Sequence, residues 1–326
     1  MRKVFDRKVS FDASNTFVAQ NSGKLLAAES AIAASPDSRD KTVDLFALYS
    51  TAGRLGEAQE LTAKWSSRDA LDPDALMARA DLAARQGDRD RAVRILGGLA
   101  DVRPNDRAVQ TRLADLQETA GNLALGCEHR LALADIAMSD AKLVADAVRC
   151  SRSQGLLDLA SRIELDATEK VREAVTRLLV AATPAQKPLS GDVQVSAEWS
   201  GGADLDVALI DAQGKRTSWL GSAGKATTTA RDVTSQRNET LAVSALPQGN
   251  YVVELSRAGG GSADTASSIR GEVTLRLGGE VRRIPFTLSG PRAEVGTVRV
   301  FFTSRLVPVD FGFGDNGNGN GNGRWR

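Results

Sequence analysis

The chain has 326 residues, about two domains by length, and its 42 Lys and Arg residues nearly balance its 41 Asp and Glu residues. This balance excludes the clustered basic surplus of a nucleic-acid-binding protein and a polybasic membrane patch. No stretch of about 18 consecutive apolar residues occurs, so no membrane span is predicted. One histidine and two cysteines exclude most metal sites and histidine-dependent catalytic sites.

The first residues are charged and lack the apolar stretch of a secretory signal. Val4, Phe5, Val9 and Phe11 are spaced as in an extended segment and not as on one helix face. Residues 1–19 are therefore predicted to be an extended N-terminal segment. We interpret this segment as the end of a strand-containing domain upstream, so that the chain is a fragment of a longer protein.

Glycines recur at intervals of 34 residues, at Gly53, Gly87, Gly121 and Gly155. A glycine that accepts positive φ ends the first helix of a pair, and a small residue lets the second helix approach the first. The small residues that follow each glycine by five positions are Ala58, Ala92, Gly126 and Ala160. Four helix pairs are therefore predicted, in residues 39–72, 73–106, 107–140 and 141–174.

A helix pair that repeats every 34 residues is typical of tetratricopeptide repeats, which this region resembles over about 140 residues. The resemblance implies that residues 20–182 form a right-handed α-solenoid with a concave groove. Residues 22–34 are expected to form a single helix before the first pair, and residues 165–182 a helix that seals the stack.

The resemblance also implies which side chains face the groove, and these are charged. They are Asp81, Arg85, Asp115, Glu118, Arg149 and Arg152. The groove would run from acidic to basic and bind a protein or peptide. Tetratricopeptide repeats that bind the C-terminal carboxylate of chaperones use a set of polar residues, and the corresponding positions here are Val43, Met77, Thr111 and Ala145. A chaperone C-terminus is therefore excluded as the partner. The alternative is that these charges only solvate a helix face.

After a linker at residues 183–190, the apolar pattern changes to a period of two. Short alternating runs such as DVQVSAEW and NYVVELSR, separated by turns, predict an antiparallel β-sandwich at residues 191–308. The fold class is therefore α + β in separate domains. The Gly- and Asn-rich tail, residues 309–326, is expected to be disordered. The predicted core of the sandwich consists of Val193, Val195, Leu205, Val207, Leu209, Leu241, Val243, Tyr251, Val253, Val273, Leu275, Ile284, Phe286, Val298, Val300 and Phe302.

The run from Trp199 to Gly214 contains Asp204-Leu-Asp206 and ends in a glycine turn. Together with LPQGNYVVEL at residues 246–255 and the strand that begins at Gly271, it resembles the YfaP-type domain of bacterial envelope proteins. The resemblance covers about residues 190–303, and the family has no assigned chemistry. It implies a location in the cell envelope or periplasm if the chain is a fragment. If Met1 is the true start, a cytoplasmic location is expected.

Three carboxylates are candidate ligands of a metal ion, and two cysteines are candidates for a disulfide bond. Asp204 and Asp206 share one face of a strand, and Asp211 lies at its end. These carboxylates, at the rim of the predicted sandwich, are therefore candidate ligands of Ca²⁺. The alternative is a charged edge that blocks strand addition. Cys127 and Cys150 fall on helices expected to pack together, which allows a disulfide in an oxidising compartment. In a reduced protein they would be two small buried side chains.

No arrangement of nucleophile and base is recognisable, and no cofactor is expected apart from the candidate Ca²⁺. The glycine runs lack the Lys-Ser/Thr and helix of a phosphate-binding loop. The sequence therefore predicts a non-enzymatic scaffold that binds a protein or peptide through the solenoid groove, with the β-sandwich as a docking or adhesion module. The alternative is a carbohydrate- or Ca²⁺-binding accessory module, in which Trp199, Trp219 and Tyr251 would stack on a sugar.

Overall fold

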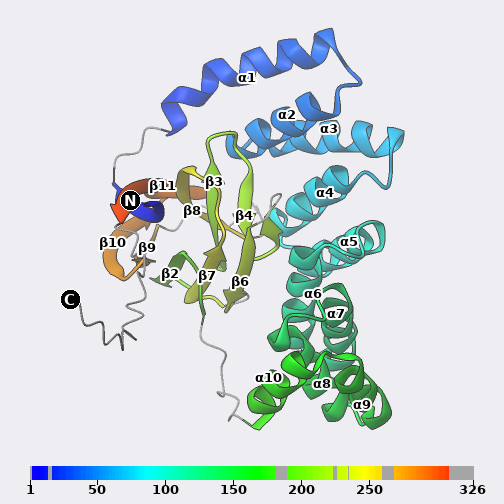
Figure 1. Ribbon diagram of the computed structural model, residues 1–326. Helices are drawn as coiled ribbons and strands as arrows, with labels where there is room; N and C mark the ends of the chain where they lie inside the picture. Colours follow the sequence, from blue (N-terminus) through cyan, green and yellow to red (C-terminus); the bar gives the residue numbers. More distant parts are fainter. Residues whose placement is uncertain are drawn as a thin grey trace, which may run out of the picture.

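The computed structural model describes residues 2–13, 17–180, 189–222, 226–233, 235–258 and 268–307. Helices occupy the first part of the chain and strands the second, except for one strand at the N-terminus (Figure 1). The predicted α + β organisation is therefore confirmed. Most of the predicted linker, residues 183–190, and the whole predicted tail, residues 309–326, lie outside the described residues.

The helices after the first form pairs that begin at intervals of 34 residues, as the glycine spacing predicts. Their bounds are α1 (Phe17–Ala34), α2 (Arg39–Thr51), α3 (Leu55–Arg68), α4 (Pro73–Arg85), α5 (Arg89–Val102), α6 (Arg107–Thr119), α7 (Leu123–Ile136), α8 (Ala141–Ser153), α9 (Leu157–Asp166) and α10 (Glu169–Val180). The helical region is therefore tetratricopeptide-like. The last helix, α10, packs on α8 and α9, where the sealing helix is predicted.

Each later pair begins with the same cap. The carboxylates of Asp72, Asp106 and Asp140 accept hydrogen bonds from the backbone N–H groups two and three residues farther on. These bonds satisfy donors that the first turn of a helix leaves free. Each pair then turns at its glycine, where φ lies between +74° at Gly53 and +82° at Gly121. Only glycine adopts this conformation without strain.

The small residues of the second helices are at close contacts, as predicted. Ala58 and Ala92 are fully buried, and Ala160 is 1% exposed. At Gly126 an added Cβ would lie 2.8 Å from Glu118 Cγ, so α6 and α7 approach more closely than an alanine would allow. The 34-residue pattern therefore fixes both the turns and the helix spacing.

The strands form two antiparallel sheets. Their bounds are β1 (Arg2–Asp12), β2 (Val193–Ser200), β3 (Leu205–Asp211), β4 (Arg216–Ser218), β5 (Gly221–Ser222), β6 (Thr227–Arg231), β7 (Asn238–Ser244), β8 (Gly249–Arg257), β9 (Ile269–Leu277), β10 (Glu280–Leu288) and β11 (Arg292–Val307). One sheet has the order β1-β11-β8-β3-β4-β5, and the other has the order β10-β9-β2-β7-β6.

One apolar core joins the two sheets, because side chains from β2, β7 and β9 cluster with side chains from β3, β8 and β11. Most of the predicted core residues belong to it. Two differ. Ile284 is only partly buried at its edge, and Phe302 is 52% exposed. The pairing of β11 with β8 ends at Val300, two residues before Phe302. Phe302 therefore lies on a part of β11 that extends beyond its pairing with β8.

The N-terminal strand corrects an expectation. Residues 2–12 do not belong to an upstream domain, because β1 pairs with β11 along its whole length, from Arg2 with Val307 to Asp12 with Thr297. Val9 and Phe11 pack against the core between the sheets. Gly296 permits this contact, since an added Cβ there would lie 2.3 Å from a ring atom of Phe11. The predicted sandwich boundary, residues 191–308, therefore omits one of its strands.

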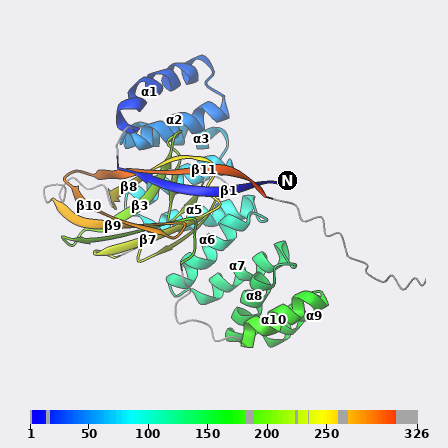
Figure 2. The same cartoon turned by 60° about the vertical axis from the view of Figure 1, so that its left-hand side comes forward.

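The helices curve along one side of the sheets (Figures 1 and 2). Trp219, Leu220 and Val233 of the strand region share a buried cluster with side chains of α4, α5 and α6. Gly214, with a φ of +83°, brings the β3–β4 turn onto α2, where an added Cβ would lie 2.9 Å from Ala47 O. The two regions are thus packed together and do not merely follow one another in the chain.

Among the described residues, no helix combines the length and the apolar character needed to cross a membrane.

Candidate functional site at the helix–sheet interface and the repeat edge

Arg89, the first residue of α5, binds two carboxylates of the strand region. Its Nη1 donates to Asp204 Oδ2 at 2.8 Å, and its Nη2 donates to Asp206 Oδ1 at 2.9 Å. Asp206 is 1% exposed, and burial raises its pKa although Arg216 and Arg89 favour its charged form. A buried carboxylate is costly unless it is paired, so this contact ties β3 to α5.

A second charged group joins α4 to β4 and β8. Arg85 Nε donates to Asp81 Oδ2 at 2.9 Å, and Arg216 Nη1 donates to Asp81 Oδ1 at 3.4 Å. Arg216 Nε also lies 3.8 Å from Glu254 Oε1. Burial alone would raise the pKa of Asp81, but Arg85 and Arg216 lower it. Asp81, predicted to face a partner, thus contacts the strand region of the same chain, and Arg85, predicted to face the same partner, is paired with Asp81.

Glu239 of β7 is the most buried acid in this interface. Its Oε2 accepts a hydrogen bond from Val207 N at 3.0 Å, whereas its Oε1 has no hydrogen-bond partner. Burial, and then the charge of Asp206, raise the pKa of Glu239 well above its ordinary value. Arg89, Arg216 and Arg112 are the cations that act on it. A proton on this carboxyl is therefore favoured in the folded chain.

Replacing Glu239 with glutamine is expected to stabilise the fold increasingly as pH rises above about 4. The folded chain binds this proton more tightly than the unfolded chain, so wild-type stability falls as pH rises through the raised pKa. Glutamine keeps an acceptor for Val207 N and does not ionise. Urea unfolding at pH 4 and pH 8 measures the effect, expected to be on the order of 1 kcal/mol at pH 8. Exposed Glu198→Gln is the control, and equal responses of both variants would contradict the assignment.

The other predicted groove residues also have partners within the helical region. Arg130 donates to Asp115 at 2.6 Å and to Glu118 at 2.8 Å. Arg149 pairs with Asp146, and Arg152 pairs with Glu164. The six charges therefore do not form one continuous surface. Asp81 and Arg85 lie under the strands, and the other four lie in the third and fourth repeats.

The three carboxylates considered for Ca²⁺ do not converge. Asp204 and Asp206 both bind the guanidinium of Arg89, which occupies the position that a cation would need. Asp211 is at the other end of β3 and accepts hydrogen bonds from the backbone N–H groups of Gln213 and Lys215. Within the described ranges, no group of three His, Cys, Asp or Glu residues could hold a metal ion. No described feature therefore favours Ca²⁺ here.

The aromatic residues considered as a sugar platform are buried. Trp199 and Tyr251 are each 6% exposed and belong to the core between the sheets. Trp219 is 1% exposed and packs against the helices, with the Arg89 guanidinium 5.5 Å from its ring centre. Because stacking on a sugar needs an exposed ring face, these three side chains do not offer such a platform.

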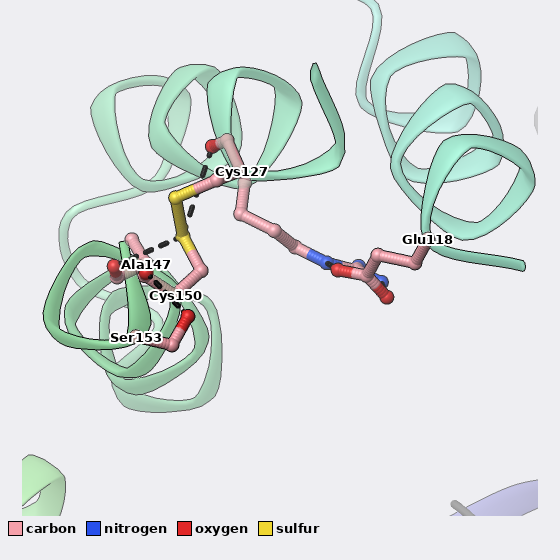
Figure 3. The surroundings of a disulfide bond; sticks show 6 residues. Glu118, Cys127, Ala147, Cys150 and Ser153 are labelled. Carbon is pink, nitrogen blue, oxygen red and sulfur yellow. Dashed lines mark hydrogen bonds and ion pairs between the residues drawn. A yellow bond between two sulfur atoms is a disulfide. The ribbon is translucent and has the colours of Figure 1, made fainter. Parts of the chain in front are cut away.

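Cys127 and Cys150 form a disulfide bond that links α7 to α8, with 5.5 Å between their Cα atoms (Figure 3). Of the two alternatives considered from the sequence, the structure has the bridged one. The bond joins the second helix of the third repeat to the first helix of the fourth. It therefore fastens two neighbouring repeats in the part of the array that the strands do not cover.

Four exposed leucines lie at one edge of the third and fourth repeats. Leu123 and Leu157 are the first residues of α7 and α9, and they are 56% and 62% exposed. Leu125 and Leu156 beside them are each 46% exposed. We call these four residues the leucine edge. The signal for it in the sequence is a leucine at the first position of a second helix with the 34-residue period, interrupted by Arg89 in the second repeat.

The leucine edge continues the interface with the strands. Arg89 occupies the same repeat position in α5 as Leu123 in α7 and Leu157 in α9. In the second repeat this position binds the strand region through Asp204 and Asp206. In the third and fourth repeats it is apolar and exposed. Exposed apolar residues that recur at equivalent positions of neighbouring repeats are candidates for an interaction site.

No family model and no curated protein matches the chain. Among solved structures, the crystal structure of MamA is 14% identical, with 49% of this chain and 88% of MamA covered and a TM-score of 0.34. A chain of the Naa15/Naa10 complex bound to HypK-THB is 18% identical, with coverages of 51% and 24% and a TM-score of 0.39. A chain of the APC/C hetero-tetramer Cut9–Hcn1 is 14% identical, with coverages of 49% and 30% and a TM-score of 0.31. Similarities this distant indicate no function.

Proposed function

We propose that this chain is a non-enzymatic scaffold that binds a protein partner through its helical repeats. The observation that supports the proposal most directly is the leucine edge. Solvent-exposed leucines at equivalent positions of consecutive repeats offer a partner a regular row of apolar contacts. The strand region already occupies the corresponding position of the second repeat through Arg89. On this proposal, the partner extends that row of contacts along the array.

In this proposal the partner binds at the leucine edge and not in the predicted groove. The groove wall formed by Asp81 and Arg85 is already in contact with Arg216 of β4. A partner at this wall would have to displace the strand region. The leucine edge requires no such displacement. Arg152, four residues before Leu156, and Glu118, five residues before Leu123, are the predicted groove residues nearest to it in the sequence.

We further propose that the helical array is a right-handed α-solenoid, that the two sheets form a YfaP-type β-sandwich, and that the protein acts in an oxidising compartment such as the bacterial envelope. The bond between Cys127 and Cys150 supports the last point, because disulfides persist mainly in oxidising environments. In this arrangement the β-sandwich is a docking module whose first partner is the array itself.

Replacing both Leu123 and Leu157 with glutamate is expected to abolish capture of the partner. Truncating or charging apolar anchors at an interface weakens binding by about 2 kcal/mol or more, roughly 30-fold. The tagged chain is cross-linked in extracts of its source cells, and bound proteins are quantified by mass spectrometry. The matched control is Leu71→Glu, because Leu71 is 66% exposed and lies outside the leucine edge.

The proposal requires a protein that is retained by wild type and by Leu71→Glu and lost from the double variant. Both changes replace exposed side chains, so the variants should unfold at the same urea concentration as wild type. If every protein retained by wild type is also retained by the folded double variant, the leucine edge is not the binding site.

A further inference from the structure

A pocket opens between the helices and the turn of the β4–β5 hairpin. Phe46 of α2, Trp65 of α3 and Met77 of α4 form its helical wall. Leu220 and Gly221 form the opposite wall. Its volume is about 70 Å³, and it opens to solvent. The pocket belongs neither to the leucine edge nor to the ion pairs of Arg89.

Glycine is needed on the strand side of the pocket. Gly214 and Gly221 have φ values of +83° and +121°, which other residues rarely adopt. At Gly214 an added Cβ would be 2.9 Å from both Ala47 O and Thr51 Oγ1. At Gly221 it would be 3.7 Å from Met77 Cε. The turns are thus held against the helices while a space remains between the apolar side chains.

The polar side chains that line the pocket include two buried atoms without a hydrogen bond to any described residue. Ser50 is 2% exposed, and its Oγ is buried with no hydrogen-bond partner. Arg216 has a side chain that is 4% exposed, and its Nε also lacks a hydrogen bond within the described residues, with Glu254 Oε1 3.8 Å away. Both residues line the pocket. Buried polar groups of native proteins are normally paired, so two such atoms beside an apolar space indicate a ligand that pairs with them.

The ligand should be neutral. Arg216 already has Asp81 and Glu254 as ionic partners, so its charge is balanced within the chain. An added anion or cation would upset this balance in a region of low dielectric constant. A neutral hydroxyl can instead accept a hydrogen bond from Arg216 Nε and pair with Ser50 Oγ. The rest of the ligand then contacts Phe46, Trp65 and Met77.

We propose that this pocket binds a neutral, largely apolar group that carries one hydroxyl group. A cavity of about 150 Å³ holds a whole benzene molecule, so this smaller space takes a ring only in part and leaves the rest at the mouth. Phenol-like groups fit that description. They occur as free small molecules and as tyrosine side chains of peptides, and both sources present the same chemistry to the pocket.

The test measures binding of p-cresol and toluene to the full chain by ligand-observed NMR. The wild type is expected to bind p-cresol about fivefold more tightly than toluene, because only p-cresol has a hydroxyl for Ser50 and Arg216. In Ser50→Ala this preference should fall to about twofold or less, since one of the two polar atoms is gone. Toluene binding should be unchanged in this variant.

A second variant tests the location. Ala78 lines the pocket and is 4% exposed, so Ala78→Leu should fill the space and weaken both probes about tenfold or more. Circular dichroism shows whether this variant is folded. If it is not folded, the preference of Ser50→Ala for p-cresol over toluene tests the proposal instead. N-acetyltyrosinamide is the third probe. Binding of it as well as p-cresol indicates a peptide source, and binding of p-cresol alone indicates a free molecule.

Three results would overturn the proposal. One is no binding of p-cresol to wild type up to its solubility limit. Another is an unchanged preference for p-cresol over toluene in Ser50→Ala. The third is full binding of both probes by folded Ala78→Leu. None of these results bears on the leucine edge, which is separate from the pocket.

Discussion

Replacing Arg89 with alanine is expected to lower the free energy of unfolding by about 3 kcal/mol or more, because Asp206 is then left buried without its nearest cation. Asp206 cannot turn to solvent, since it is 1% exposed and its backbone is held in β3 by pairing with Ser256 of β8. Urea unfolding followed by tryptophan fluorescence measures the change. Trp219, whose ring centre is 5.5 Å from the Arg89 guanidinium, reports on the same interface.

The control for this prediction is Arg91→Ala. Arg91 is on the same helix and is exposed, so its loss should change stability by less than about 0.5 kcal/mol. The effect of Arg89→Ala should also shrink as pH falls, because a protonated Asp206 no longer needs a cation. Equal unfolding midpoints for the two variants, or a loss that is independent of pH, would contradict the role assigned to Arg89.

Removing the disulfide is expected to have an effect of similar size. A bridge between residues 23 apart restricts the unfolded chain, and the double variant Cys127→Ala/Cys150→Ala should lose about 3 kcal/mol. Urea unfolding without reductant measures the loss. The control is wild-type protein in reductant, which should become as unstable as the variant. Two titratable thiols in native, unreduced wild type would show that the bridge is absent.

The helical repeats could be predicted from the sequence because their determinants are local. Gly53, Gly87 and Gly121 end first helices, and Asp72 and Asp106 begin the following ones. Each of these residues acts within its own turn of backbone. The alternation of apolar residues in β2 and β9 likewise predicts their buried faces without knowledge of their neighbours.

The features that were missed depend on contacts between distant parts of the chain. The sequence of β1 identifies an extended segment but does not identify β11 as its partner. The pair Asp204 and Asp206 is compatible with a cation of any kind, and the structure supplies Arg89 instead. Trp219 is an aromatic residue suited to several roles, and its burial against α4, α5 and α6 follows only from the packing of the two regions.

The pairing of β1 with β11 constrains the order in which the protein can fold during synthesis. Arg2 is synthesised some 300 residues before its partner Val307. Most contacts of the helical repeats join neighbouring helices and can form in the interval, whereas β1 must stay unpaired. Charged residues are frequent in this strand, among them Lys3, Asp6 and Lys8, and charges on an unpaired strand oppose aggregation. The pairing of β1 thus has to wait until β11 has been synthesised.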